Sequence, residues 1–218
     1  MDEVGQNMIL RKQLVYLLIF LGFVLPSFAV VVSAHHPSED QNFTTPHQGT
    51  DFPVGWDDLS YSSFPPNQFR LLYPAMSDGE NTEMAGNGPF PHIQFFIDSG
   101  ESSESYMDFT SRLVKRGFIV AVHRDSYDST DFNEILEQTV EVHERLQELN
   151  NSSSGPVVGS FGQFDLTHWG VGGHGVGAAG AYGVYPYWMN STLHDLVQPP
   201  RALFGLGVDF SDWDGKHW

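Results

Sequence analysis

Residues 169–180 have the residue types and spacing of a turn that could position a catalytic side chain or bind a ligand. They read WGVGGHGVGAAG, so an apolar strand would run into Gly173-His174-Gly175-Val176-Gly177 and a helix of small residues would follow. A sharp strand-to-helix turn of this layout, a nucleophile elbow, exposes one reactive side chain, a serine, at its middle position. Here that position is Gly175, which has no side chain and can be neither nucleophile nor base.

The same glycines also fit a second motif. Gly175, Gly177 and Gly180 match the G-x-G-x-x-G pattern of a dinucleotide-binding turn, in which a pyrophosphate lies at the helix N-terminus. That motif also needs an acidic residue at a strand end, about 20 residues further along the chain. Asp195 has this spacing, but it lies in a segment without a convincing strand. A dinucleotide-binding domain therefore stays open as an alternative.

Charge and histidine spacing bear on two further classes of function. The chain has 27 Asp and Glu residues against 10 Lys and Arg, and this net charge of -17 argues against binding to a phosphate backbone. Its 10 histidines are scattered without an H-E-x-x-H motif, and His123 and Asp125 at one strand end do not make a metal site. We expect an acidic protein with no nucleic-acid partner, no metal and no cofactor.

The elements that must position the elbow alternate along the chain. Expected strands are 69–74, 92–97, 118–122, the segment from 167 into the elbow and 202–208, and expected helices are 105–116, 131–149 and the small-residue segment after the elbow. Alternating strands and helices are typical of a parallel sheet covered by helices. The sequence therefore predicts an α/β fold.

Residues 1–34 have the pattern of an export segment. Arg11 and Lys12 precede an uncharged run that ends in Val32-Ser33-Ala34, which fits a signal peptide with a small-residue cleavage site. The run also approaches the roughly 20 residues that span a bilayer, so an N-terminal membrane anchor stays open. Either one would export the domain, to be secreted or anchored on the outer face of the cytoplasmic membrane.

The rest of the chain divides into a linker and one domain. Residues 35–66 are rich in Ser, Thr, Pro, His and Asp, which predicts an extended linker. The domain then spans 67–218. Because the chain has no cysteine, packing and not disulfides must hold the exported fold together.

Four sequence blocks, in this order, resemble the α/β-hydrolase family. They are 95–100 with Ser105-Tyr106, 113–122, 164–177 and 201–207, and they cover roughly residues 68 to 210. The likeness is to an exported branch with cutinase-like polyester hydrolases, platelet-activating-factor acetylhydrolases, chlorophyllases and dienelactone hydrolases. It implies a mostly parallel sheet with helices on both faces, here a partial domain truncated after the strand that follows the elbow helix.

The resemblance also implies roles for individual residues. In the family a serine at the Gly175 position attacks an ester, and the backbone N–H groups of Val176 and Glu101 would hold the oxyanion. Gly173, His174 and Gly177 complete the elbow. The family's catalytic acid and histidine follow the elbow, where this chain offers only His194 and His217, both expected on the surface. No triad is then intact.

Two function classes follow from this resemblance. The first is an exported carboxylic-ester hydrolase homologue without catalysis, a pseudoenzyme or fragment that keeps a small ester or lipid-like ligand in its cleft. The alternative is an active esterase, lipase-like or cutinase-like enzyme with an unconventional nucleophile, or one completed by residues beyond Trp218. In both cases we expect contact with a membrane only through an uncleaved N-terminal segment.

Overall fold

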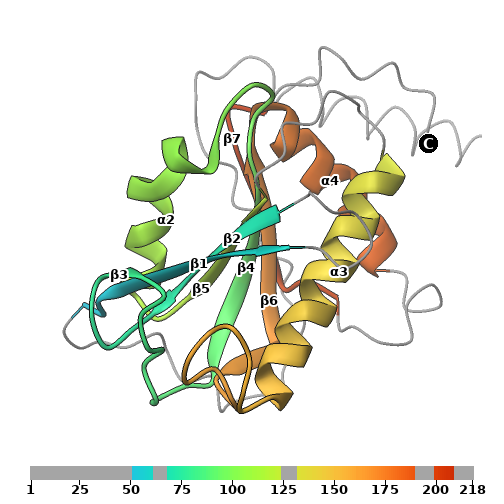
Figure 1. Cartoon of the computed structure of the whole chain (residues 1–218). Coiled ribbons are helices and arrows are strands. Elements are labelled where there is room, and N and C mark those ends of the chain that lie inside the picture. Colours follow the sequence, from blue (N-terminus) through green and yellow to red (C-terminus); the bar gives the residue numbers. More distant parts are fainter. Residues whose placement is uncertain (1–50, 61–67, 124–131, 190–198, 209–218) are drawn as a thin grey trace, which may run out of the picture. The chain divides into compact units, whose positions relative to one another are not determined.

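The computed structural model describes residues 51–60, 68–123, 132–189 and 199–208, and in this part of the chain seven strands form one sheet (Figure 1). The strand order is β3-β1-β2-β5-β4-β6-β7. The elements are β1 (Val54–Ser60), β2 (Gln68–Pro74), β3 (Gly79–Glu80), β4 (Phe90–Phe96), η1 (Ser103–Tyr106), α2 (Met107–Val114), β5 (Ile119–His123), α3 (Phe132–Asn151), β6 (Phe164–His174), α4 (Gly175–Met189) and β7 (Ala202–Leu206).

The sheet is mixed. Strands β5, β4, β6 and β7 are parallel, whereas β2 runs antiparallel to both β5 and β1. A helix connects each parallel strand to the next one along the chain: α2 links β4 to β5, α3 links β5 to β6, and α4 links β6 to β7. The predicted α/β class is therefore confirmed, and the expectation of a mostly parallel sheet holds for the strands that carry the elbow but not for β1 and β2.

Helices cover both faces of the sheet. Phe95 and Val120 pack in one apolar cluster with Val114 of α2, while Phe96 packs in another with Ile135 of α3 and Ala181 of α4. Neighbouring residues of a strand point to opposite faces, so these contacts assign α2 to one face and α3 with α4 to the other, as Figure 1 shows. The carboxyl ends of the parallel strands then meet at one edge of the sheet.

Strand β1 corrects part of the predicted linker. Val54–Ser60 lies within residues 35–66 but pairs along its whole length with β2. Asp is rare in β-strands, so a sequence with Asp57 and Asp58 at adjacent positions did not predict this strand. Side chains of β2 bind both carboxylates: Asp57 accepts a 2.5 Å hydrogen bond from the Tyr73 hydroxyl, and Asp58 forms an ion pair with Arg70.

Arg70 ties β1, β2 and η1 together. Its Nε and Nη2 atoms donate to the two Asp58 oxygens at 2.8 and 3.0 Å, its Nη1 lies 3.0 Å from Glu104 Oε1, and its Cζ lies 4.3 Å from the centre of the Trp56 ring. The guanidinium is largely buried and bidentate, a geometry in which ion pairs do contribute to stability.

Arg70→Met is expected to lower the free energy of unfolding by about 2 kcal/mol, because it removes charge-assisted hydrogen bonds and leaves two carboxylates without their cation. Urea denaturation monitored by circular dichroism measures the change. The matched control is Arg116→Met, since Arg116 is 63% exposed and lies 3.5 Å from Asp51. Surface pairs of this kind contribute about 0.5 kcal/mol or less. Equal losses in the two variants would contradict the role given to Arg70.

Several predictions fall on residues outside the described ranges. These are the N-terminal segment 1–34, most of the linker, and His194 and His217. Within the described residues, we find no helix with both the length and the apolar character needed to cross a bilayer.

Candidate functional site

The predicted strand, turn and helix of the elbow are present. Strand β6 ends at His174, α4 begins at Gly175, and Gly175 has a φ of +53°, in the left-handed region that favours glycine. The two flanking glycines allow α4 to approach β4 closely. A Cβ at Gly173 would lie 2.6 Å from the Phe96 carbonyl oxygen, and one at Gly177 would lie 2.5 Å from the same oxygen.

The Asp98 side chain fills the position that the elbow side chain would take. Asp98 follows β4, the strand next to β6, and a Cβ built on Gly175 would overlap its carboxylate. Its Oδ1 accepts hydrogen bonds of 2.9 Å from the backbone N–H groups of Val176 and Ser99. A carboxylate at a helix N-terminus is favourable, because the N–H groups of the first turn have no partner inside the helix.

Tyr106 and His174 complete this cluster. The Asp98 N–H donates to the Tyr106 hydroxyl at 3.1 Å, and that hydroxyl lies 2.9 Å from His174 Nδ1. Burial raises the pKa of Tyr106, and the negative charges of Asp98 and Glu101 raise it further, so the phenol stays protonated. The same hydroxyl donates to His174 Nδ1 or accepts from it, according to the tautomer of His174.

This hydrogen bond engages Nδ1 of His174. A ring that accepts at Nδ1 carries its proton on Nε2, and a ring that donates from Nδ1 has its lone pair on Nε2. Nε2 lies on the side of Gly207 at the end of β7, where a Cβ would be 3.4 Å away. Nδ1 is 3.8 Å from Asp98 Oδ2, and the His174 and Asp98 side chains are 40% and 31% exposed. Tyr106 thus occupies Nδ1, and Nε2 is the ring nitrogen that lies beside Gly207.

Both N–H groups that were assigned to the oxyanion have acceptors in the structure. The Val176 N–H binds the Asp98 carboxylate, and the Glu101 N–H donates to the Asp98 carbonyl at 3.2 Å in a tight turn. The Glu101 side chain is exposed. Sequence reasoning named Glu101 and Val176 but did not assign a role to Asp98. The only signal for Asp98 was its place directly after a buried strand.

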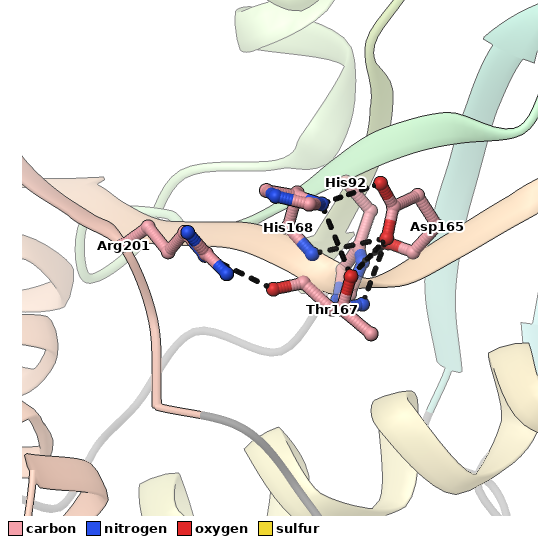
Figure 2. Close-up of polar contacts among 5 residues, drawn as sticks. All are labelled: His92, Asp165, Thr167, His168 and Arg201. Atoms are coloured by element: carbon pink, nitrogen blue, oxygen red, sulfur yellow. Dashed lines mark hydrogen bonds and ion pairs between the residues drawn. The ribbon is translucent and has the colours of Figure 1, made fainter. Parts of the chain in front are cut away.

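A second polar cluster lies at the opposite end of β6 (Figure 2). Asp165 Oδ1 accepts from the Thr167 N–H at 2.9 Å, the Thr167 hydroxyl at 2.7 Å and the His168 N–H at 3.1 Å, and Oδ2 lies 2.7 Å from His168 Nδ1. Burial alone would raise the pKa of Asp165, but these hydrogen bonds outweigh it and lower the pKa. Arg201 closes the cluster by donating from Nε to the Thr167 carbonyl at 3.3 Å.

The second cluster has a structural explanation. Strand β6 shifts register against β4 here, since Pro91 pairs with Asp165 while the next residue, His92, pairs with Trp169. The Asp165 carboxylate binds the backbone of the extra residues and so holds this bulge. The Asp165 carboxylate and the Thr167 hydroxyl both lie at the same ring nitrogen, Nδ1 of His168, so these three residues form no nucleophile-base-acid chain.

The remaining candidate chemistries gain no support from the geometry. Among the described residues, no group of three or more His, Cys, Asp or Glu side chains could hold a metal ion. For the dinucleotide alternative, the phosphate would have to lie at the N-terminus of α4, where the Asp98 carboxylate already binds Val176. Two negative groups repel each other at this distance. Asp195 lies outside the described residues.

Comparison with known proteins does not assign the chain to a family: no family model matches it, and no curated protein matches it. The likeness to α/β hydrolases therefore depends on the four sequence blocks and the elbow.

Proposed function

We propose that the chain is an exported α/β-hydrolase-like domain, of carboxylic-ester hydrolase ancestry, that does not hydrolyse esters. One observation carries the proposal: the Asp98 carboxylate lies where the elbow side chain would be and accepts the Val176 N–H. The exported location rests on the charge and hydropathy pattern of residues 1–34 alone.

Ester hydrolysis by an elbow needs a nucleophile, a base with a free lone pair, and N–H donors for the oxyanion. Gly175 supplies no nucleophile. Nδ1 of His174 is engaged by Tyr106, and the Val176 N–H is engaged by Asp98. An oxyanion formed here would also face a carboxylate at a few ångströms, which costs on the order of several kcal/mol in a poorly solvated site.

Ligand binding at this edge remains compatible with the same residues. Open α/β sheets bind ligands at the carboxyl ends of their strands, which is where Asp98, His174 and Gly207 lie. Asp98 and Glu101 disfavour an anion there, so a neutral ester or lipid-like molecule fits the charge better than a free acid.

The second candidate is a working hydrolase that uses Asp98 as its nucleophile. It is favoured by one detail: among the described residues no hydrogen bond reaches Asp98 Oδ2, which lies 3.8 Å from His174 Nδ1. Attack by Oδ2 on an ester carbonyl would release the alcohol and form an acyl-Asp98 anhydride, and water would then return the free acid and the Asp98 carboxylate.

An assay with p-nitrophenyl acetate and p-nitrophenyl butyrate separates the two candidates. We expect the purified protein to release p-nitrophenol no faster than buffer, and Asp98→Asn to behave in the same way, because no competent nucleophile is present. Glu101→Gln is the matched control, since it removes a neighbouring carboxylate at an exposed position. Turnover that is lost in Asp98→Asn but kept in Glu101→Gln, with an acyl adduct in the intact mass, would overturn the inactive proposal.

A further inference from the structure

The interface between α3 and the sheet has a polar middle. The buried face of α3 carries Gln138, Thr139 and His143 between apolar residues, and the strands beneath it contribute polar side chains that are likewise buried. We call this set the polar layer. Its members are His92 and Gln94 of β4, His123 of β5, and Gln138, Thr139 and His143 of α3.

The polar layer is only partly satisfied by hydrogen bonds. The Gln94 amide donates to the Thr139 carbonyl at 3.0 Å, and His92 Nδ1 lies 3.4 Å from the Asp165 carbonyl. Three buried atoms in the layer have no hydrogen-bond partner among the described residues: His92 Nε2, Gln94 Oε1 and His143 Nδ1. Buried polar atoms without partners weaken an interface, because the water they lost on folding is not replaced.

The histidine rings are packed against aromatic rings. His92 stacks on Trp169, with ring centroids 5.6 Å apart. The His143 ring centroid lies 5.3 Å from that of His92 and 5.8 Å from that of Trp169, which it meets edge-on. His123 stacks on Phe96 at 4.0 Å. These surroundings accommodate a neutral imidazole and offer a charged one little solvation.

Little negative charge reaches the polar layer from the described residues. Asp165 of β6 favours the charged form of His92, but burial and the neighbouring His143 lower the pKa of His92 by more, and the Asp165 carboxylate is also bound by Thr167 and His168. Helix α4 has no acidic or basic residue in its end turns, and its sequence has none between them.

On α3 itself, the residues three and four positions from His143 are Thr139, Val140, Leu146 and Gln147, which carry no negative charge. Glu137, Glu144 and Glu148 are exposed. Glu141 and Arg145 each lie two positions from His143, about 200° around the helix.

We propose that the polar layer is a proton-sensitive latch, through which mild acid loosens α3 from the sheet before the other helices are affected. Protonating His92 and His143 places two positive charges on rings whose centroids lie 5.3 Å apart, and the charge of Asp165 offsets their repulsion only in part. On the opposite face of the sheet, Phe109 and Val114 of α2 pack with Phe95 and Val120 in an apolar cluster. Acid therefore acts on the face covered by α3 and not on the face covered by α2. This inference does not depend on the proposed function.

The direction of the pH effect follows from the buried state. Burial lowers the pKa of His92 and of His123 to about 3 and that of His143 to about 4, whereas a released histidine titrates near 6.5. The docked state is thus fully favoured above about pH 6.5, and the preference is lost as the pH falls toward 4. Each histidine that gains a proton on release raises the release equilibrium constant by up to about tenfold per pH unit in this window.

Hydrogen exchange measured by mass spectrometry at pH 7 and pH 5 tests the latch. After correction for intrinsic exchange, we expect peptides from α3 to lose protection by more than about tenfold, and peptides from α2 to lose less than about threefold. Parallel loss in α2 and α3 would overturn the proposal.

Two variants make the test specific to the histidines. His143→Leu removes one titrating group, so the pH response of α3 should shrink by a factor of about ten. Val142→Ala, at the neighbouring buried position, should weaken protection at both pH values and leave their ratio unchanged. If His143→Leu does not fold, His92→Phe serves in its place. An undiminished pH response in the folded variant would also overturn the proposal.

Discussion

Replacing Gly177 by alanine is expected to lower the free energy of unfolding by more than about 3 kcal/mol. The added Cβ would overlap the Ile97 carbonyl oxygen and lie 2.5 Å from the Phe96 carbonyl oxygen and 2.7 Å from the Phe96 carbonyl carbon. These are backbone atoms at the end of β4, so relief requires α4 to move away from the sheet. Urea denaturation measures the loss.

Gly180→Ala is the matched control in the same helix. A Cβ there would lie 2.5 Å from Ile135 Cδ1, which is the far end of a flexible side chain and can rotate away. Alanine also favours a helix over glycine by about 1 kcal/mol, so this variant should be near neutral. If the two alanines cost the same, close approach of α4 to β4 is not the reason for Gly177.

A double-mutant cycle on Gly175 and Asp98 should show strong coupling. Gly175→Ala alone is expected to cost about 3 kcal/mol, because alanine is strained at a φ of +53° and its Cβ overlaps the Asp98 carboxylate. Asp98→Ala alone should cost about 1 kcal/mol through the lost contact with the α4 N-terminus. The double variant should be more stable than the sum of the two losses predicts, by about 1 to 2 kcal/mol, since the overlap is gone.

The control for this cycle pairs Gly175→Ala with Glu101→Ala. The Glu101 side chain is exposed and is not among the atoms nearest to a Cβ at Gly175, so these two effects should add. Additive losses for Gly175 and Asp98 would mean that the carboxylate does not fill the elbow, and the main support for an inactive site would be lost. The cycle also sets a condition for restoring a nucleophile: Gly175→Ser needs Asp98 removed at the same time.

Much of the fold could be predicted where local pattern and tertiary environment agree. The apolar runs at 92–97 and 118–122 are strands β4 and β5, and the amphipathic segment 131–149 is most of α3. Strand β1 was missed because Asp57 and Asp58 are unfavourable in a strand by themselves, whereas in the fold they bind Tyr73 and Arg70 of β2. A residue that looks unfavourable alone becomes acceptable when a partner from another strand meets it.

The polar layer under α3 was missed for a related reason. The sequence places His92, His123 and His143 in three different elements, and nothing in the local pattern says that they share one interface. The pairing of β4 with β5, together with the crossover by α3, brings them together in the interior.

The sequence by itself determined that the elbow has no reactive side chain. Residue 175 is glycine, and the small residues around it allow a tight turn into a helix whatever the rest of the chain does. Only the tertiary structure decided that the Asp98 carboxylate fills the position of the elbow side chain. Val176 binds a carboxylate 78 positions away in the chain, because parallel pairing of β4 and β6 sets their carboxyl ends side by side. Strand register acts over such distances in sequence, and no local pattern encodes it.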